Sequence, residues 1–166
     1  MKNFDFVSPT KIYFGLNKEE MIGSIIASYG FKKVLLHYGQ NSIKKIGLYK
    51  KVINSLKKSK IDYVELGGVL PNPDVSLVNE GIKICKENNV EMILAVGGGS
   101  VIDSGKLIAN GYYYDGDPFD ISTHKYVSQK SLPVGVILTN AASGSELSNS
   151  CVISSREKKM KQGYNT

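Results

Sequence analysis

The sequence is poor in the residues that build disulfides and metal sites, with two cysteines and two histidines among 166 residues. Cys85 falls in a helical pattern and Cys151 in a strand-like one, and neither has a CxxC or Cys/His neighbour. Both are therefore predicted to be small core residues. His37 falls within a strand and His124 in a polar stretch, which predicts structural roles for both and no tetrahedral metal site between them.

Long apolar runs are also missing. No run approaches the roughly 18 residues of a membrane-spanning helix, and residues 1–5 lack the apolar core of a signal peptide. We therefore expect a cytoplasmic protein without a membrane partner. A chain of 166 residues fits one ordinary domain, which buries about two thirds of its unfolded surface.

Acidic residues are outnumbered, with 15 Asp and Glu against 21 Lys and Arg, which gives a net charge of +6. A basic chain could bind nucleic acid, but no interleaved aromatic residues or RNA-binding signature accompany the lysines. We expect a solvated helix face and no nucleic-acid partner. The lysines gather on one predicted helix and near residue 160, as Lys44, Lys45, Lys50, Lys51, Lys57, Lys58, Lys158, Lys159 and Lys161.

The sequence does contain a regular alternation of strand-like and helical segments. Strands are predicted at residues 11–14, 34–37, 61–66, 92–96 and 134–138. Helices are predicted at residues 19–29, from a capping Ser42 through Leu56, at residues 74–88 and after Ser100. Because the strands are apolar without alternation, the expected fold is α/β, with a mostly parallel sheet covered by helices on both faces.

A glycine-rich turn follows the strand at residues 92–96 and leads into a helical pattern. Gly97, Gly98 and Gly99 lack a Cβ, so the chain can turn tightly and a ligand can approach the backbone closely. The free amides from Ser100 onward point at that ligand with the positive end of the helix dipole. This pattern predicts a phosphate cradle, although it matches neither G-x-G-x-x-G nor the P-loop. A purely structural turn, with Ser100 and Asp103 spaced as a capping box, is the alternative.

Two other polar loops follow strands of the same predicted sheet. One spans residues 38–42, and the other is a run of small and hydroxyl residues at 139–146. Taken alone, the second loop fits an ordinary capped turn equally well. Ligands bind such sheets at the carboxyl ends of the strands, so the three loops are predicted to share one crevice.

Four segments together resemble the iron-dependent alcohol dehydrogenase family, with NADP-dependent butanol dehydrogenases as the nearest group. They are residues 96–103, the opening at 9–15, Pro71-Asn72-Pro73 and residues 139–146. The resemblance covers essentially the whole chain. It implies that residues 1–166 form a Rossmann-like dinucleotide-binding domain. The family's helical carboxyl-terminal domain, with one Asp and three His that hold a divalent metal such as iron, would then be absent from this chain.

The resemblance also implies roles for individual residues. Gly97, Gly98, Gly99 and Ser100 would receive the pyrophosphate, with Asp103 near the nicotinamide. Thr139 and Ser143 match two threonines that contact the cofactor. The implied reaction is hydride transfer between the nicotinamide and a small alcohol or aldehyde, with a metal that polarises the carbonyl. Without the metal ligands, this chain alone is expected to bind cofactor and turn over no substrate. A homodimer is a further expectation.

The loop after the second predicted strand bears on the choice of cofactor. It consists of Gly39, Gln40, Asn41 and Ser42, and it should meet the adenosine ribose. NAD-preferring sites place a carboxylate there, which would repel a 2′-phosphate. The absence of an acid, with Lys44 and Lys45 close behind, favours NADP over NAD. Ordinary surface lysines with no specific role are the alternative.

Two other functions stay open. A non-enzymatic nucleotide- or phosphate-binding module would need the glycine turn and nothing more. Metal-dependent glycerol dehydrogenases and dehydroquinate synthase share the glycine-rich motif, so a fragment of an enzyme of the glycerol dehydrogenase type is the second alternative.

Overall fold

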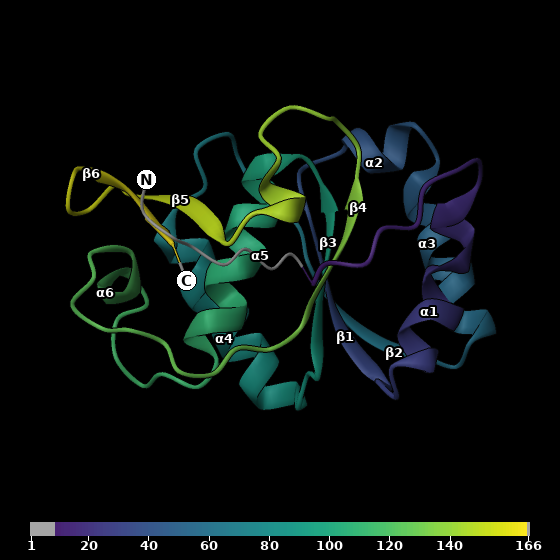
Figure 1. Ribbon diagram of the computed structural model, residues 1–166, viewed down its shortest axis with the longest axis horizontal. Coiled ribbons are helices and arrows are strands. Elements are labelled where there is room, and N and C mark those ends of the chain that lie inside the picture. Colours follow the sequence, from purple (N-terminus) through teal and green to yellow (C-terminus); the bar gives the residue numbers. More distant parts are fainter. Residues whose placement is uncertain (1–8, 166) are drawn as a thin grey trace, which may run out of the picture.

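Four parallel strands form the central sheet of the computed structural model, which describes residues 9–165 (Figure 1). Their order across the sheet is β2-β1-β3-β4. In register, Leu35 of β1 lies between Val64 of β2 and Ile93 of β3. All four carboxyl ends therefore lie at one edge. The strands are β1 (Lys33–Tyr38), β2 (Asp62–Leu66), β3 (Met92–Gly97) and β4 (Val134–Leu138).

Helices cover both faces of this sheet, as the α/β prediction required (Figure 1). One face carries the short η1 (Lys18–Met21) with α1 (Ile22–Ser28), α2 (Ser42–Lys45) and α3 (Leu48–Lys58). The other carries α4 (Val75–Asn88) and α5 (Gly99–Gly111). Beyond α5 lie α6 (Phe119–Ser122) and an antiparallel hairpin of β5 (Ser150–Ser155) and β6 (Met160–Asn165). A second short element, η2 (Ser145–Leu147), precedes the hairpin.

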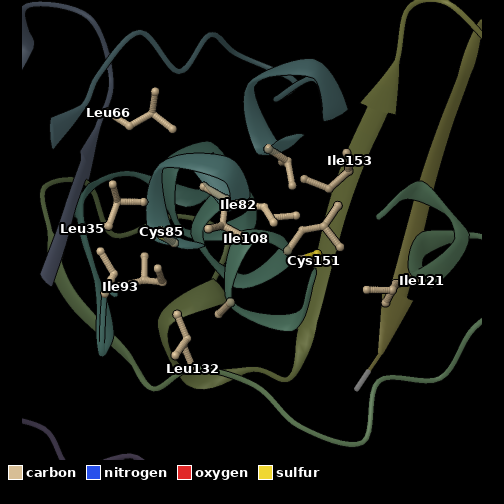
Figure 2. Close-up of a cluster of buried hydrophobic side chains, with 14 of the residues drawn as sticks. Leu35, Leu66, Ile82, Cys85, Ile93, Ile108, Ile121, Leu132, Cys151 and Ile153 are labelled. Atoms are coloured by element: carbon tan, nitrogen blue, oxygen red, sulfur yellow. The ribbon is translucent and has the colours of Figure 1, made fainter. Parts of the chain in front are cut away.

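Each face of the sheet has its own apolar core. Val34 and Leu36 face α1 and α3, whereas Leu35, between them in sequence, faces α4 and α5. Successive residues of a strand point to opposite faces, so burial of all three explains why the strand sequence does not alternate. Cys85 and Cys151 are buried, unpaired members of the core on the α5 side, which confirms the core roles predicted for them (Figure 2).

Three sequence predictions need correction. Residues 9–14 form no strand, and Ile12 and Phe14 are exposed, because no described segment pairs with them. The helix predicted from Ser42 to Leu56 is divided into α2 and α3, since Gly47 takes a φ of +78° between them. Ser42 is the first residue of α2 and not its cap. Asn41 occupies the cap position, and its side chain makes no capping bond.

The predicted surface character of the lysines is confirmed. All nine lysines named from the sequence are exposed, and Lys51 of α3 binds Glu19 at 2.7 Å. Within residues 9–165, no helix is both long and apolar enough to cross a membrane.

His37 joins three elements inside the core. It is fully buried on β1, with Nδ1 2.9 Å from the carbonyl oxygen of Leu66 and Nε2 2.9 Å from the hydroxyl of Ser104 on α5. The carbonyl can only accept, so Nδ1 carries the proton and Nε2 accepts from Ser104. This confirms the predicted structural role. His124 does not share this buried position. It is exposed and takes a φ of 58° in the turn after α6.

Burial makes His37 a source of acid sensitivity. It lowers the pKa of His37 from 6.5 to about 4, so the unfolded chain takes up this proton before the folded one does. The stability that neutral His37 contributes is complete above pH 6.5 and is lost as the pH falls from about 6.5 to 4. A pKa difference of this size amounts to about 3 kcal/mol. Urea unfolding at pH 7, 5.5 and 4.5 measures the loss.

Two variants test whether His37 causes this loss of stability. His37→Gln should flatten the dependence of the unfolding free energy on pH between 6.5 and 4, at some cost in stability at pH 7. His124→Asn, which suits the positive φ and removes an exposed imidazole, should leave the dependence unchanged. Equal pH dependence in His37→Gln and the parent protein would contradict the assignment.

Candidate functional site

The turn between β3 and α5 presents free backbone amides. Gly98 has φ −92° and ψ −171° and caps α5 without a side-chain bond, and α5 begins at Gly99. The amides of Val101 and Ile102 both donate to the Gly98 carbonyl, at 3.0 and 3.2 Å. Among residues 9–165, the amides of Gly98, Gly99 and Ser100 donate to no protein acceptor, and all three residues are half-buried. Such amides at a helix start suit an anion.

The capping-box alternative for this turn is wrong. Ser100 lies inside α5, one residue after its first, and the cap position belongs to Gly98. The Asp103 carboxylate turns instead toward the segment after β4, where it accepts the Ser145 hydroxyl at 2.6 Å and the Val152 amide at 3.0 Å.

The loop after β4 packs directly against the glycine turn. In Figure 1 it arches over the ends of β3 and β4 and returns across the first turns of α5. The amide of Thr139 donates to the Gly97 carbonyl at 3.1 Å. A Cβ placed on Gly99 would lie 2.4 Å from Oγ of Ser143, so a side chain there would displace the Ser143 hydroxyl. Thr139 and Ser143 both keep exposed surface.

The loop after β1 reaches the same edge through Val101. A Cβ on Gly97 would lie 2.6 Å from Cγ2 of Val101, and one on Gly39 would lie 3.9 Å from the same atom. Val101, in the first turn of α5, therefore lies close to both the glycine turn and the loop after β1. The other predicted residues of this loop, namely Gln40, Asn41 and Ser42, are exposed and continue into α2. The structure thus brings the three loops to one edge, as predicted.

A polar cluster beside the β1 loop was not visible in the sequence. The hydroxyls of Tyr38 and Tyr49 donate to the two carboxylate oxygens of Glu65, at 2.8 and 2.7 Å. Burial, together with the bond to Glu65, raises the pKa of Tyr38 to about 12. The Lys44 ammonium lies 5.2 Å from each tyrosine ring centre, within range of cation–π attraction. This cluster holds Lys44 next to the loop that it follows.

Lys106 is the second feature that sequence reasoning missed. Its ammonium reaches carbonyl oxygens of Ser145, Ser148 and Ser150 in the segment after β4. Burial lowers the pKa of Lys106, and the carboxylate of Asp103 acts in the opposite sense. The only signal in the sequence was that Asp103 and Lys106 are three apart on one helix, which places them on the same face.

The described residues do not supply a metal site. No group of three or more His, Cys, Asp or Glu comes together within residues 9–165.

The fold and the edge of the sheet define a Rossmann-like α/β domain with free amides at a glycine turn. The family model for iron-containing alcohol dehydrogenase matches residues 9–166. The chain therefore belongs to the iron-containing alcohol dehydrogenase family.

Individual relatives agree with this assignment. The probable NADH-dependent butanol dehydrogenase 1 of Bacillus subtilis is 50% identical over 164 residues, which are 99% of this chain and 42% of that protein. The crystal structure of NADH-dependent butanol dehydrogenase A from Thermotoga maritima superposes with a TM-score of 0.98 at 45% identity, over 100% of this chain and 42% of that one. The NADPH-dependent aldehyde reductase of Escherichia coli is 36% identical over 169 residues, covering 100% and 43%. The chain thus spans about two fifths of the length of these relatives.

Gly98 offers a test of whether the turn binds a ligand. Its backbone angles suit any residue, and a Cβ there would meet no protein atom within 4 Å. Gly98→Ala should therefore leave the unfolding free energy unchanged or raise it by up to about 1 kcal/mol. If a phosphate group lies against this backbone, the same change should weaken dinucleotide binding by at least about tenfold, because the methyl group fills that space. Calorimetry with NADP and NAD measures the binding.

Gly163→Ala is the matched control, because an added Cβ on β6 would make only ordinary contacts, 3.5 Å from Val152. Its binding should equal that of the parent protein. Unaltered binding in Gly98→Ala would remove the turn from the ligand site.

Proposed function

We propose that this chain is the dinucleotide-binding domain of an iron-containing alcohol dehydrogenase that interconverts small alcohols and aldehydes. The observation that carries the proposal is the set of three free amides, from Gly98, Gly99 and Ser100, where α5 begins. The relatives are named as butanol dehydrogenases and an aldehyde reductase, which supports the substrate class.

The residues at the sheet edge fit a dinucleotide by their shape and their donors. The amides at residues 98–100 would bind the pyrophosphate, since it can approach a backbone without side chains. Thr139 and Ser143 are exposed beside the turn, and their hydroxyls would contact the cofactor. When bound, the nicotinamide supplies hydride chemistry, and the protein orients it. Asp103 would act near the nicotinamide by holding the segment after β4, through its bonds to Ser145 and Val152.

The proposed cofactor is NADP in preference to NAD. Residues 39–42 contain no carboxylate, whereas NAD-preferring sites place one after this strand. Lys44 is held nearby by Tyr38 and Tyr49, and Lys45 is exposed. The butanol dehydrogenase relatives are named NADH-dependent and the E. coli relative NADPH-dependent, so the names do not decide between the two cofactors.

We further propose that these 166 residues bind cofactor without turning over substrate, because the described residues bring no metal ligands together. The purified chain should show no aldehyde-dependent oxidation of NADPH above the rate without protein, in the presence or absence of added ferrous iron. Robust aldehyde reduction by this chain would contradict the proposal.

Gln40→Glu tests the choice of cofactor. The change keeps the side-chain shape and adds one negative charge at an exposed position of the β1 loop. Like-charge repulsion with a 2′-phosphate should weaken NADP binding by about fivefold or more, which corresponds to about 1 kcal/mol at a partly exposed site. Binding of NAD should change little, and calorimetry with both cofactors compares them.

Gln129→Glu, at an exposed position in the segment after α6, adds the same negative charge outside the three loops and is the control for the change in net charge. It should leave both affinities unchanged. A parent protein that binds NAD as tightly as NADP would remove the preference, whereas equal loss of both cofactors in Gln40→Glu would mean that residue 40 does not discriminate between them.

A further inference from the structure

Lys106 gathers the chain after β4 around a single cation. Its Nζ lies 2.5 Å from the carbonyl oxygen of Ser145, 2.7 Å from that of Ser148 and 2.8 Å from that of Ser150. The Ser145 hydroxyl lies 3.0 Å away. An ammonium has three N–H donors, so the three carbonyls match its full donor set. The chain bends here around a fixed positive charge.

Asp103 holds the same segment one turn earlier on α5. Its two carboxylate oxygens accept the Ser145 hydroxyl and the Val152 amide. Apolar packing contributes little to residues 145–150, because Leu147 is the one apolar residue among them and it is exposed. A surface loop with few apolar contacts opens easily unless polar bonds hold it. Its conformation therefore depends on the two charged side chains of α5.

The bonds of Lys106 reach the glycine turn through two serines. Lys106 binds Ser145, and the Ser145 amide lies 3.4 Å from the Ser143 hydroxyl. That hydroxyl in turn occupies the space that a side chain on Gly99 would fill. The position of Ser143 beside the free amides is thus linked to a cation two turns along the helix.

We propose that Lys106 is a positioning residue for dinucleotide binding. Its ammonium folds residues 145–150 around itself and so holds Ser143 beside the amides at the start of α5. The inference rests on the proposed function, because it assumes that a dinucleotide binds at the glycine turn. Lys106 acts through the loop after β4, and its role differs from that of a residue in contact with the cofactor.

The test compares two lysine substitutions. Lys106→Met keeps the length of the side chain and removes the charge. Lys86→Met is the matched control, because Lys86 also makes a hydrogen-bonded ion pair, to Asp115 at 2.8 Å, in a part of the molecule outside the three loops. Calorimetry gives the Kd for NADP, hydrogen exchange follows residues 139–152, and urea unfolding gives the stability of each variant.

Loss of the cation should weaken NADP binding on the order of tenfold, since a displaced binding group costs affinity even when it is intact. Amides of residues 139–152 should exchange faster, while those of β1 and β3 keep their protection. Lys86→Met should bind like the parent protein. Lys106→Arg should bind with an affinity between those of the parent and Lys106→Met, because its planar fork keeps the charge but fits three converging carbonyls less well.

Any other result contradicts either the proposed function or the positioning role of Lys106. If the parent protein binds neither NADP nor NAD, the proposed function is wrong. If the parent binds and Lys106→Met binds equally well, the positioning role is wrong. Faster exchange throughout the sheet, with binding lost only in proportion to unfolding, would also overturn it. Should Lys106→Met not fold, Lys106→Arg decides, because it keeps the charge, changes only how the cation meets the three carbonyls, and must still weaken binding and loosen residues 139–152 relative to the parent protein.

Discussion

The close contact between the first turns of α5 and the sheet edge is the constraint on which the other features depend. Val101 fills the space beneath Gly97, and Ser143 fills the space beside Gly99. A side chain at Gly97 would press on the Val101 side chain of α5, and one at Gly99 would displace the Ser143 hydroxyl. The absence of side chains at these two glycines lets Val101 and Ser143 pack against the turn between β3 and α5, beside the amides of Gly98, Gly99 and Ser100.

The polar residues of α5 extend this contact in two directions. Ser104 reaches inward to His37, so the helix is bonded to β1 through a buried imidazole. Asp103 and Lys106 reach outward and hold the chain after β4. One helix therefore orders the sheet below it and the loop beside it. The glycine turn, its free amides, Asp103 and Lys106 therefore all lie within one short stretch of sequence, residues 97–106.

Much of the fold could be predicted from the sequence, because burial on both faces leaves a direct pattern. The strands at residues 34–37, 92–96 and 134–138 and the helix at 74–88 are all present, the last with Asp74 bonded to the Ser76 amide as its cap. The errors fall where local pattern is insufficient. Residues 11–14 have strand-forming side chains, but a strand also needs a neighbour to pair with. Gly47 lies within a helical repeat, and its left-handed backbone became apparent only in the folded chain.

The sequence by itself determined the parallel α/β architecture, the glycine turn and the family, because these follow from apolar patterning and from the order of short motifs. Only the tertiary structure decided which partners the polar side chains take. Asp103 and Lys106 meet serines about 40 residues further along the chain, and Lys44 lies over two tyrosines held by Glu65. Such bonds join residues that are distant in sequence, and a hydroxyl or an ammonium fits many partners equally well. Their choice is made by the packing of α5 and the sheet, which the local sequence does not encode.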